Sequence, residues 1–453
     1  MTDRYAVVWA RTATEPIKMG HLVATDREMR FSYTPEFLER QEVAGLSLLL
    51  PPTLWQTRPF IHQATEILPL LPRLMALIPG KNVNNIQRRI YTGLLAKRPH
   101  PPAPGFETEW ELLMLTGHNG IGHIDVFQDD RAALEFYGTK PESRKRIGSR
   151  SELWHFLKDQ THQESSNEAL DILRLIGPTP SVGGQIPKLL VSIPDKNKWD
   201  GSVAAPGVRQ VDGVPHTDVV MKIEDPQYQG ITALEALCLE VHREWGLEVP
   251  RHWRASIDGL SVLAVERFDR TKDGNALPME SFFSVYATGQ QQVRTTTDAE
   301  VEQLGSMILK LSEIVDIDAA QARAEVYRRF VLALLTGNGD LHLENLAFLG
   351  GPKNVRLAPV FDPAPMRAWD RHDLLSALPF YIDAKRGLAY SLARVGESFG
   401  LTNHGAMEIL QNLMKMTKAY PERVLALKDV PEDTRKKLAA RVKTLRAKLN
   451  AKS

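Results

Sequence analysis

The sequence has a single cysteine, Cys238, among its 453 residues. One thiol cannot form an internal disulfide, and no Cys/His group has the spacing of zinc ligands, so a disulfide framework and a zinc module are excluded. An excess of one charge is also missing, since 56 Lys and Arg stand against 55 Asp and Glu, for a net charge of +1. A chain so close to neutral has no overall field that attracts nucleic acid, and any DNA contact must come from a local patch or a partner.

Long apolar runs are absent as well. Residues 68–79 form one of the most apolar stretches, but Pro and Arg interrupt it, and it is shorter than the roughly 20 residues that span a bilayer. The first residues carry charges on both sides of a very short apolar run, which is not the pattern of a signal peptide. We therefore expect a cytoplasmic protein without membrane contact.

Length and proline content divide the chain into units. At about 150 residues per domain, the length of the chain corresponds to roughly three structural units. The prolines of residues 98–105 forbid a helix and favour an extended connector. We predict a mixed module at 1–135, a β-rich lobe at 136–272 and a helical lobe at 273–453.

The periodicity of apolar residues indicates the elements within these units, because strands alternate with period two and helices repeat near 3.6. Strands are expected at 5–9, 29–33, 124–127, 187–193, 217–223 and 261–268, with helices at 109–115 and 233–245. Further helices are expected at 299–315, 318–336, 407–419 and 432–451. A β-rich lobe followed by a helical lobe is an α+β fold, with a nucleotide cleft between the lobes as one option.

The segment 336–349 carries the clearest chemical signal. A long amphipathic helix ends at two glycines that flank Asn338, followed by Asp340 and, five residues later, Asn345. Phosphoryl transfer to a hydroxyl needs a carboxylate at the acceptor and an amide oxygen for Mg²⁺, and this spacing supplies both. Asp362 follows a plausible strand and is a second candidate Mg²⁺ ligand. The alternative interpretation is that the segment with Asp340 and Asn345 and the segment with Asp362 are two unrelated loops, each of a common type.

The β-rich unit offers candidate phosphate ligands. Lys222 lies on an apolar strand, where a buried ammonium needs a phosphate or a carboxylate such as Glu235 or Glu240 on the next helix. The alternative is an edge lysine that reaches water. Residues 180–188 place adjacent glycines before another lysine, which lets backbone N–H groups approach an anion. This segment is not a Walker A loop, and a simple hairpin turn is the alternative.

Two further segments have polar character. The apolar strand 262–265 is followed by the charged residues Glu266, Arg267, Asp269 and Arg270, with Phe268 among them. This pattern is typical of a hinge whose backbone binds adenine, or of a strand end with an ion pair. Residues 435–452 contain eight Lys and Arg and no acidic residue. Such a terminal helix is either a solvated face or, less often, a contact for DNA or a partner.

In this order, the segments resemble the HipA family of bacterial serine/threonine kinases, the toxins of HipBA toxin–antitoxin systems. The resemblance extends across nearly the whole chain. It implies a two-lobed protein-kinase-like fold with an additional N-terminal α+β module. The segments that carry it are 31–38 with 46–51 for that module, 181–188 for the phosphate loop, 265–270 for the hinge, 340–345 for the catalytic loop and 361–362 for the metal motif.

The resemblance also implies residue roles. Asp340 would be the catalytic base in a loop that includes His342, and Asn345 and Asp362 would hold Mg²⁺. The residues implied to bind ATP are Gly183, Gly184, Gln185, Lys188, Lys222, Asp362 and, through the backbone at adenine, Glu266, Arg267 and Phe268. Ser181 occupies the position of the family's autophosphorylated serine, where a phosphate of about −2 charge would repel the phosphates of ATP.

The implied partners are a HipB-like helix-turn-helix antitoxin, a protein substrate such as an aminoacyl-tRNA synthetase, and DNA only through the antitoxin complex. Two positions depart from the family pattern. The family usually has a basic residue just before the asparagine of the catalytic loop, whereas this chain has Glu344 before Asn345. The family also usually has two acidic residues after the hinge, whereas this chain offers one carboxylate there, Glu280. Two alternatives therefore stay open: a small-molecule phosphotransferase, whose loops usually have His at the position of Asn338, and a catalytically weak co-repressor.

Overall fold

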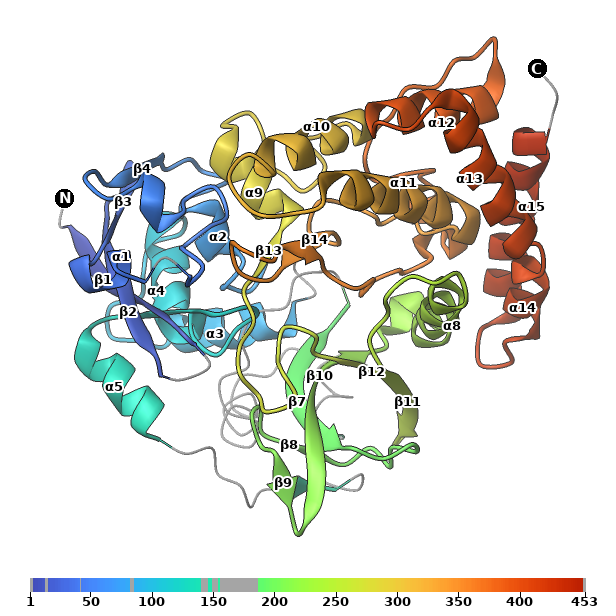
Figure 1. Cartoon of the computed structure of the whole chain (residues 1–453). Coiled ribbons are helices and arrows are strands. Elements are labelled where there is room, and N and C mark those ends of the chain that lie inside the picture. The colour runs from blue at the N-terminus through green and yellow to red at the C-terminus, as the bar shows by residue number, and fades with distance from the viewer. Residues whose placement is uncertain are drawn as a thin grey trace.

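The computed structural model describes residues 3–12, 15–40, 42–81, 85–139, 146–148, 154 and 186–450 (Figure 1). Its N-terminal part is built on an antiparallel sheet with the strand order β4-β3-β2-β1-β5. The strands predicted at 5–9, 29–33 and 124–127 are confirmed. The bounds of the strands are β1 Arg4–Ala10, β2 Ile17–Ala24, β3 Glu28–Tyr33, β4 Phe60–Gln63 and β5 Ile124–Phe127.

Helices and turns complete this part. The predicted helix at 109–115 is α4, and the proline-rich segment 98–105 connects it to α3. Asn85 begins α3, because its side chain accepts a hydrogen bond from the Arg88 N–H in the first turn. The elements are α1 Pro35–Leu38, the 3₁₀ turn η1 Pro52–Leu54, α2 Pro72–Met75, α3 Ile86–Ala96, α4 Phe106–Thr116 and α5 Asp130–Gly138.

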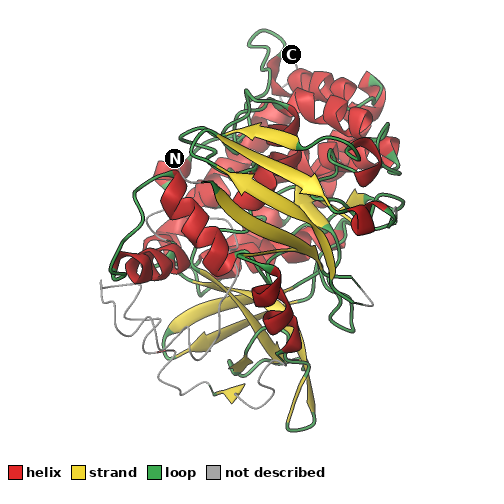
Figure 2. Cartoon of the chain, turned by 90° about the vertical axis from the view of Figure 1, so that its left-hand side faces the viewer, coloured by secondary structure: helices red, strands yellow, loops and turns green. Residues whose placement is uncertain are grey.

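The second sheet lies apart from the first, as Figure 2 shows. Its strand order is β11-β12-β10-β7-β8-β6, with β9 paired to β10. The strands predicted at 187–193, 217–223 and 261–268 are confirmed as β7, β10 and β12, and the helix predicted at 233–245 is α8. The elements are β6 Arg146–Ile147, β7 Lys188–Pro194, β8 Val203–Ala204, β9 Gln210–Val211, β10 Val214–Ile223, the 3₁₀ turn η2 Pro226–Tyr228, α8 Ile231–Glu244, β11 His252–Ile257 and β12 Leu260–Glu266.

The C-terminal part is helical, as expected, and includes a small sheet with the order β13-β14-β15. The helices predicted at 299–315, 318–336, 407–419 and 432–451 are α10, α11, α13 and α15. The elements are β13 Met279–Ser281, α9 Phe282–Gly289, α10 Val301–Leu311, α11 Ala319–Thr336, β14 Ala347–Leu349, β15 Arg356–Leu357, η3 Met366–Ala368, η4 Asp370–His372, α12 Gly387–Ser398, α13 Asn403–Met416, α14 Tyr420–Ala426 and α15 Glu432–Asn450.

Buried side chains form separate clusters in the three parts. Residues between 6 and 126 make one cluster, the faces of β7, β10 and β12 contribute to another, and the helices from α9 onward dominate the largest. These clusters agree with an α+β plan, while the domain boundaries at 135 and 272 stay a prediction. No helix within the described ranges is both long and apolar enough to cross a bilayer.

Candidate active site

Two lysines lie opposite each other on neighbouring strands. The register of the antiparallel pair β7 and β10 places Lys188 directly across from Lys222. Lys188 is 7% exposed and Lys222 is 3% exposed, so neither ammonium is an edge group in water. Like charges opposite each other in a sheet repel, and a buried ammonium needs an anionic partner.

Asp362 supplies that partner for both lysines. Its Oδ2 lies 2.7 Å from Lys188 Nζ, and its Oδ1 lies 2.7 Å from Lys222 Nζ. Lys222 also pairs with the buried carboxylate of Glu235 on α8. Of the two candidates on this helix, Glu235 is therefore the partner, since Glu240 faces Arg423 instead.

The pKa values reflect this arrangement. Burial alone would raise the pKa of Asp362, but the attraction of Lys188 and Lys222 outweighs burial and holds it well below its ordinary value. Burial would lower the pKa of Lys222, yet Asp362 and Glu235 together raise it. Asp362 is thus a carboxylate and Lys222 an ammonium ion at neutral pH.

The candidate catalytic loop leaves the C-terminus of α11 and runs to β14 (Figure 1). Gly337 ends the helix in the left-handed conformation, with φ of 73°. Gly339 has no room for a side chain, because a Cβ there would lie 2.8 Å from the carbonyl oxygen of Leu374. The buried Leu343 anchors the far end of the loop, where its N–H donates to the Thr296 carbonyl at 3.0 Å.

Asn338 and Asn345 hold the backbone of Asp340. The Asp340 N–H donates to Asn338 Oδ1 at 2.9 Å, and Asn345 Nδ2 donates to the Asp340 carbonyl at 2.8 Å. The second bond commits the amide nitrogen of Asn345 and leaves its Oδ1 as an acceptor. Burial raises the pKa of Asp340, His342 opposes the rise, and Asp362 adds to it. Asp340 and Asp362 therefore belong to one electrostatic site.

The His342 N–H donates to the Asp340 carbonyl at 2.8 Å, but the two side chains share no hydrogen bond. His342 Nδ1 accepts from the Glu344 N–H at 3.2 Å, so in the neutral ring the proton is on Nε2. That Nε2 lies 3.9 Å from Asp340 Oδ1, beyond hydrogen-bond distance. The contact between the two side chains is therefore electrostatic.

The donor set fits a magnesium ion that shares ligands with phosphates. Asn345 Oδ1 and the Asp362 carboxylate are hard oxygen ligands, and Mg²⁺ in proteins often has only one or two protein ligands beside phosphate and water. Among the described residues, no group of three or more His, Cys, Asp and Glu could hold a metal by itself. The residues thus suit a metal that arrives with a nucleotide.

The predicted hinge residues lie at the end of β12. The Glu266 N–H donates to the Arg251 carbonyl and the Arg267 N–H to the Asp218 carbonyl, each at 2.9 Å. Both donors are thus used within the protein, while the Phe268 N–H has no hydrogen-bond partner in the described part of the chain. The Phe268 ring packs against Phe361, at 5.4 Å between centroids.

The side chain of Arg267 has a structural function that the sequence did not reveal. It is buried, pairs with Asp269 at 2.7 Å and donates to the Gly120 carbonyl at 2.9 Å. The neighbouring Arg270 donates to the same carbonyl at 2.8 Å. The segment predicted to be the hinge is therefore bonded to a loop of the N-terminal module.

The structure brings together Asp340, His342, Asn345, Asp362, Lys188 and Lys222 from separate predicted segments. Ser181, Gly183, Gly184 and Gln185 lie outside the described residues. Sequence reasoning missed Tyr228, whose hydroxyl lies 2.6 Å from His372 Nε2 and whose pKa, raised mainly by burial, is raised further by Asp340. No motif marks Tyr228, which lies in a connecting turn.

The basic C-terminal helix is occupied by contacts within the chain. Lys437 and Arg441 each bind Asp370 at 2.7 Å, and Arg441 also pairs with Asp373. Leu438 packs close to Gly337 at the start of the catalytic loop. Part of the predicted charged face therefore supports the segment after Asp362.

Comparison with known proteins places the chain in a family. The profile of the HipA-like C-terminal domain matches residues 180–420, just over half of the chain. The protein named "Putative kinase Y4dM" of Sinorhizobium fredii is 27% identical over 195 residues, 40% of this chain and 43% of that protein. A "Putative kinase" of Haemophilus influenzae is 28% identical over 231 residues, 48% of this chain and 62% of that protein. The chain thus spans about half the length of these relatives.

The fold is also that of a solved structure. A chain of the Shewanella oneidensis toxin–antitoxin complex of HipA, HipB and operator DNA superposes with a TM-score of 0.65. The match covers 96% of this chain and 95% of that chain at 18% identity, which establishes a shared fold. The predicted fold class, two kinase-like lobes with an additional N-terminal module, is confirmed. Since the family profile covers most of both lobes and includes every described residue of the candidate site, the chain belongs to the HipA-like C-terminal domain family.

Proposed function

We propose that the protein is an ATP- and Mg²⁺-dependent protein serine/threonine kinase. The observation that carries the proposal is the convergence of Lys188 and Lys222 on Asp362, in one electrostatic site with Asp340. Phosphoryl transfer is catalysed mainly by positioning and charge stabilisation, which requires cations at the phosphates and a carboxylate at the acceptor hydroxyl.

Each group then has a distinct task. Lys188 and Lys222 are placed to bind the phosphates of ATP, which compete with Asp362 for the two ammonium groups. Asn345 and Asp362 would hold magnesium, which neutralises charge on the phosphates when it is bound. The raised pKa of Asp340 makes its carboxylate a stronger base toward the acceptor hydroxyl. The Phe268 N–H, which has no partner among the residues that the structure describes, is the donor offered to adenine.

The substrate and partners follow from family membership and the resemblance. We propose a toxin that acts in the cytoplasm on a protein of the translation machinery, such as an aminoacyl-tRNA synthetase, and that autophosphorylates at Ser181. A HipB-like antitoxin would bind it and provide the DNA contact. The Shewanella relative, whose structure contains HipB and operator DNA, and the net charge of +1 support an indirect contact with DNA.

The test is phosphate transfer by the purified chain with Mg²⁺ and labelled ATP. Asp340→Asn and Asp362→Asn should each lower transfer to protein by about 100-fold or more, and both should relieve growth arrest on expression. Asp370→Asn, which changes an exposed carboxylate that is 68% accessible, is the matched control and should stay active. Mass spectrometry should find phosphate on Ser181, and Ser181→Ala should lose it.

The same assay separates the alternatives. Label that accumulates on metabolites and never on protein would replace this proposal with a small-molecule phosphotransferase. Tight binding of ATP with Mg²⁺ but no transfer to any acceptor would replace it with a co-repressor. Growth arrest that persists in both Asp variants would show that kinase chemistry is not its cause.

A further inference from the structure

The segment after Asp362 forms one wall of the candidate active site. It contains the short 3₁₀ turns η3 and η4, and it packs directly on Gly339, the residue before Asp340. A Cβ at Gly339 would lie 2.8 Å from the Leu374 carbonyl oxygen and 3.4 Å from that of His372. An acceptor whose hydroxyl reaches Asp340 therefore comes close to residues 371–374.

Tyr228 joins this wall from the β-rich lobe. Its hydroxyl lies 2.6 Å from His372 Nε2, and its ring meets the Trp369 ring edge to face, at 5.4 Å between centroids. Burial is the main cause that raises the pKa of Tyr228, and Asp340 is near enough to raise it further. The turns η2 and η4 thus lie in the same neighbourhood as the candidate catalytic base.

Arg371 is held in place on this wall while its side chain stays exposed. Its guanidinium carbon lies 4.3 Å from the centre of the Tyr228 ring, and its Nη1 donates to Gln227 Oε1 at 2.8 Å. The neighbouring His372 adds no charge at pH 7, because burial and then Arg371 lower its pKa below 6.5. Arg371 is therefore the cation that this part of the wall presents.

The carboxylates nearest to Arg371 in the sequence and at Tyr228 have other partners. Asp370 binds two cations of α15, Asp373 binds Arg367, and Asp225 caps the turn η2. Arg371 forms no ion pair with these or with any other carboxylate that the structure describes. A guanidinium that is oriented and exposed, but not paired with a carboxylate, can bind one from another molecule.

The acceptor substrate is the molecule that can supply this carboxylate. The phosphates of ATP have Lys188 and Lys222, whereas Arg371 lies on the wall beside Asp340, where the acceptor hydroxyl is expected. We infer that Arg371 selects protein substrates that have Asp or Glu within about three residues of the acceptor hydroxyl, or roughly 10 Å of extended chain. This inference rests on the proposed kinase function and adds to it the chemistry of the preferred substrate.

Serine peptides that differ at one position test the inference, with the full chain, Mg²⁺ and labelled ATP. Each position from three before to three after the serine carries Glu, Gln or Lys in turn. At one position or more, kcat/KM should be about tenfold higher with Glu than with Gln, and lower again with Lys.

The outcomes separate this inference from the proposed function. Equal transfer to the three peptides at every position, or transfer to proteins but to none of the peptides, would overturn the inference and leave the kinase function intact. No transfer to any acceptor would remove the kinase function, and the inference would fall with it.

Variants assign the preference to Arg371. Arg371→Glu should reverse the order and favour Lys, Arg371→Gln should remove the difference between Glu and Gln, and Arg371→Lys should keep part of it. A uniform fall with all three peptides in Arg371→Gln would mean that Arg371 only supports Tyr228, which would contradict the inference. Arg58→Gln is the matched control and should keep the preference of the wild type, since Arg58 is also exposed and stacks on a ring, that of Trp55, at 4.9 Å.

Discussion

Lys188 and Lys222 face each other across β7 and β10, and both ammonium groups bind the carboxylate of Asp362. The sheet alone would place two like charges in repulsion, so Asp362 stabilises the register of these strands as well as the candidate site. If Asp362 has both functions, a substitution at this position should lower the stability of the fold as well as the activity.

Asp362→Asn should therefore destabilise the protein as well as inactivate it. Removing one partner of a buried ion pair costs about 3–5 kcal/mol, because it leaves uncompensated charge. Urea denaturation measures this loss. Lys188→Met in the Asp362→Asn background should restore part of the stability without activity, because it removes one of the opposed charges. A double variant no more stable than Asp362→Asn would contradict this explanation.

Glu235 should make stability depend on pH. Burial is the main cause that raises its pKa from 4.5 to about 7, against the attraction of Lys222. The folded state then binds the proton of the Glu235 carboxyl group more tightly than the unfolded state does. The contribution of Glu235 to the free energy of unfolding is therefore complete below pH 4.5 and is lost as the pH rises toward 7. The free energy of unfolding of the wild type, measured relative to Glu235→Gln, should fall across this interval. A constant difference would mean that Glu235 stays ionised when buried.

Glu344 should limit the rate of phosphoryl transfer. It precedes Asn345, and its carboxylate forms no ion pair with the described residues, so its charge opposes negative charge on the transferred group. Glu344→Lys should raise kcat by about tenfold, which corresponds to about 1.4 kcal/mol, and Glu344→Gln should give a smaller rise. Single-turnover kinetics are the measurement. Unchanged rates in both variants would show that this carboxylate is remote from the transferred phosphate.

Tyr420 should connect α8 to the end of α11, where the candidate catalytic loop begins. Its hydroxyl donates to the Thr336 carbonyl at 3.0 Å and contacts Cys238 Sγ of α8 at 3.2 Å. Tyr420→Phe leaves that buried carbonyl unpaired and should cost about 1–3 kcal/mol. It should also lower kcat more than it changes KM for ATP, whereas a purely structural residue would alter stability alone. Tyr390→Phe, whose hydroxyl accepts from Arg386 near the surface, is the control.

The sequence predicted most elements because local patterns determine them. The alternation that marks β3 and the apolar stripe of α8 reflect burial of one face, and the glycines after α11 mark its end at Gly337. The order of Asp340, Asn345 and Asp362 led to the prediction of a phosphoryl-transfer site, and the structure brings Asp340 and Asp362 into one electrostatic site. These signals lie within a few residues of the groups they describe.

Which charged side chains pair with each other within the fold could not be predicted, because these contacts join segments that are far apart in the sequence. Glu235 and Glu240 lie on one helix, and only the packing of α8 on the sheet decides that the first meets Lys222 while the second meets Arg423. Arg267 resembles a surface residue at a strand end, yet it is buried against a loop about 150 residues earlier.

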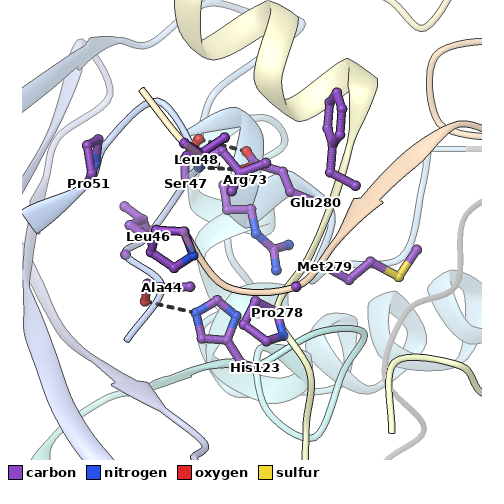
Figure 3. A pocket seen from close by; sticks show the side chains of 15 residues that line it. Ala44, Leu46, Ser47, Leu48, Pro51, Arg73, His123, Pro278, Met279 and Glu280 are labelled. Carbon is purple, nitrogen blue, oxygen red and sulfur yellow. Dashed lines mark hydrogen bonds between the residues drawn. The ribbon is translucent and has the colours of Figure 1, made fainter. Parts of the chain in front are cut away.

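The contacts of the N-terminal module have a mechanical consequence. It holds the predicted hinge segment through the Gly120 carbonyl, and it holds the helical part through Glu280, which binds Ser47 and Leu48 (Figure 3). Contacts from one body to both lobes restrict how the lobes can move relative to each other. If the lobes move apart, one of these two sets of contacts must be strained or broken, so the module limits that movement.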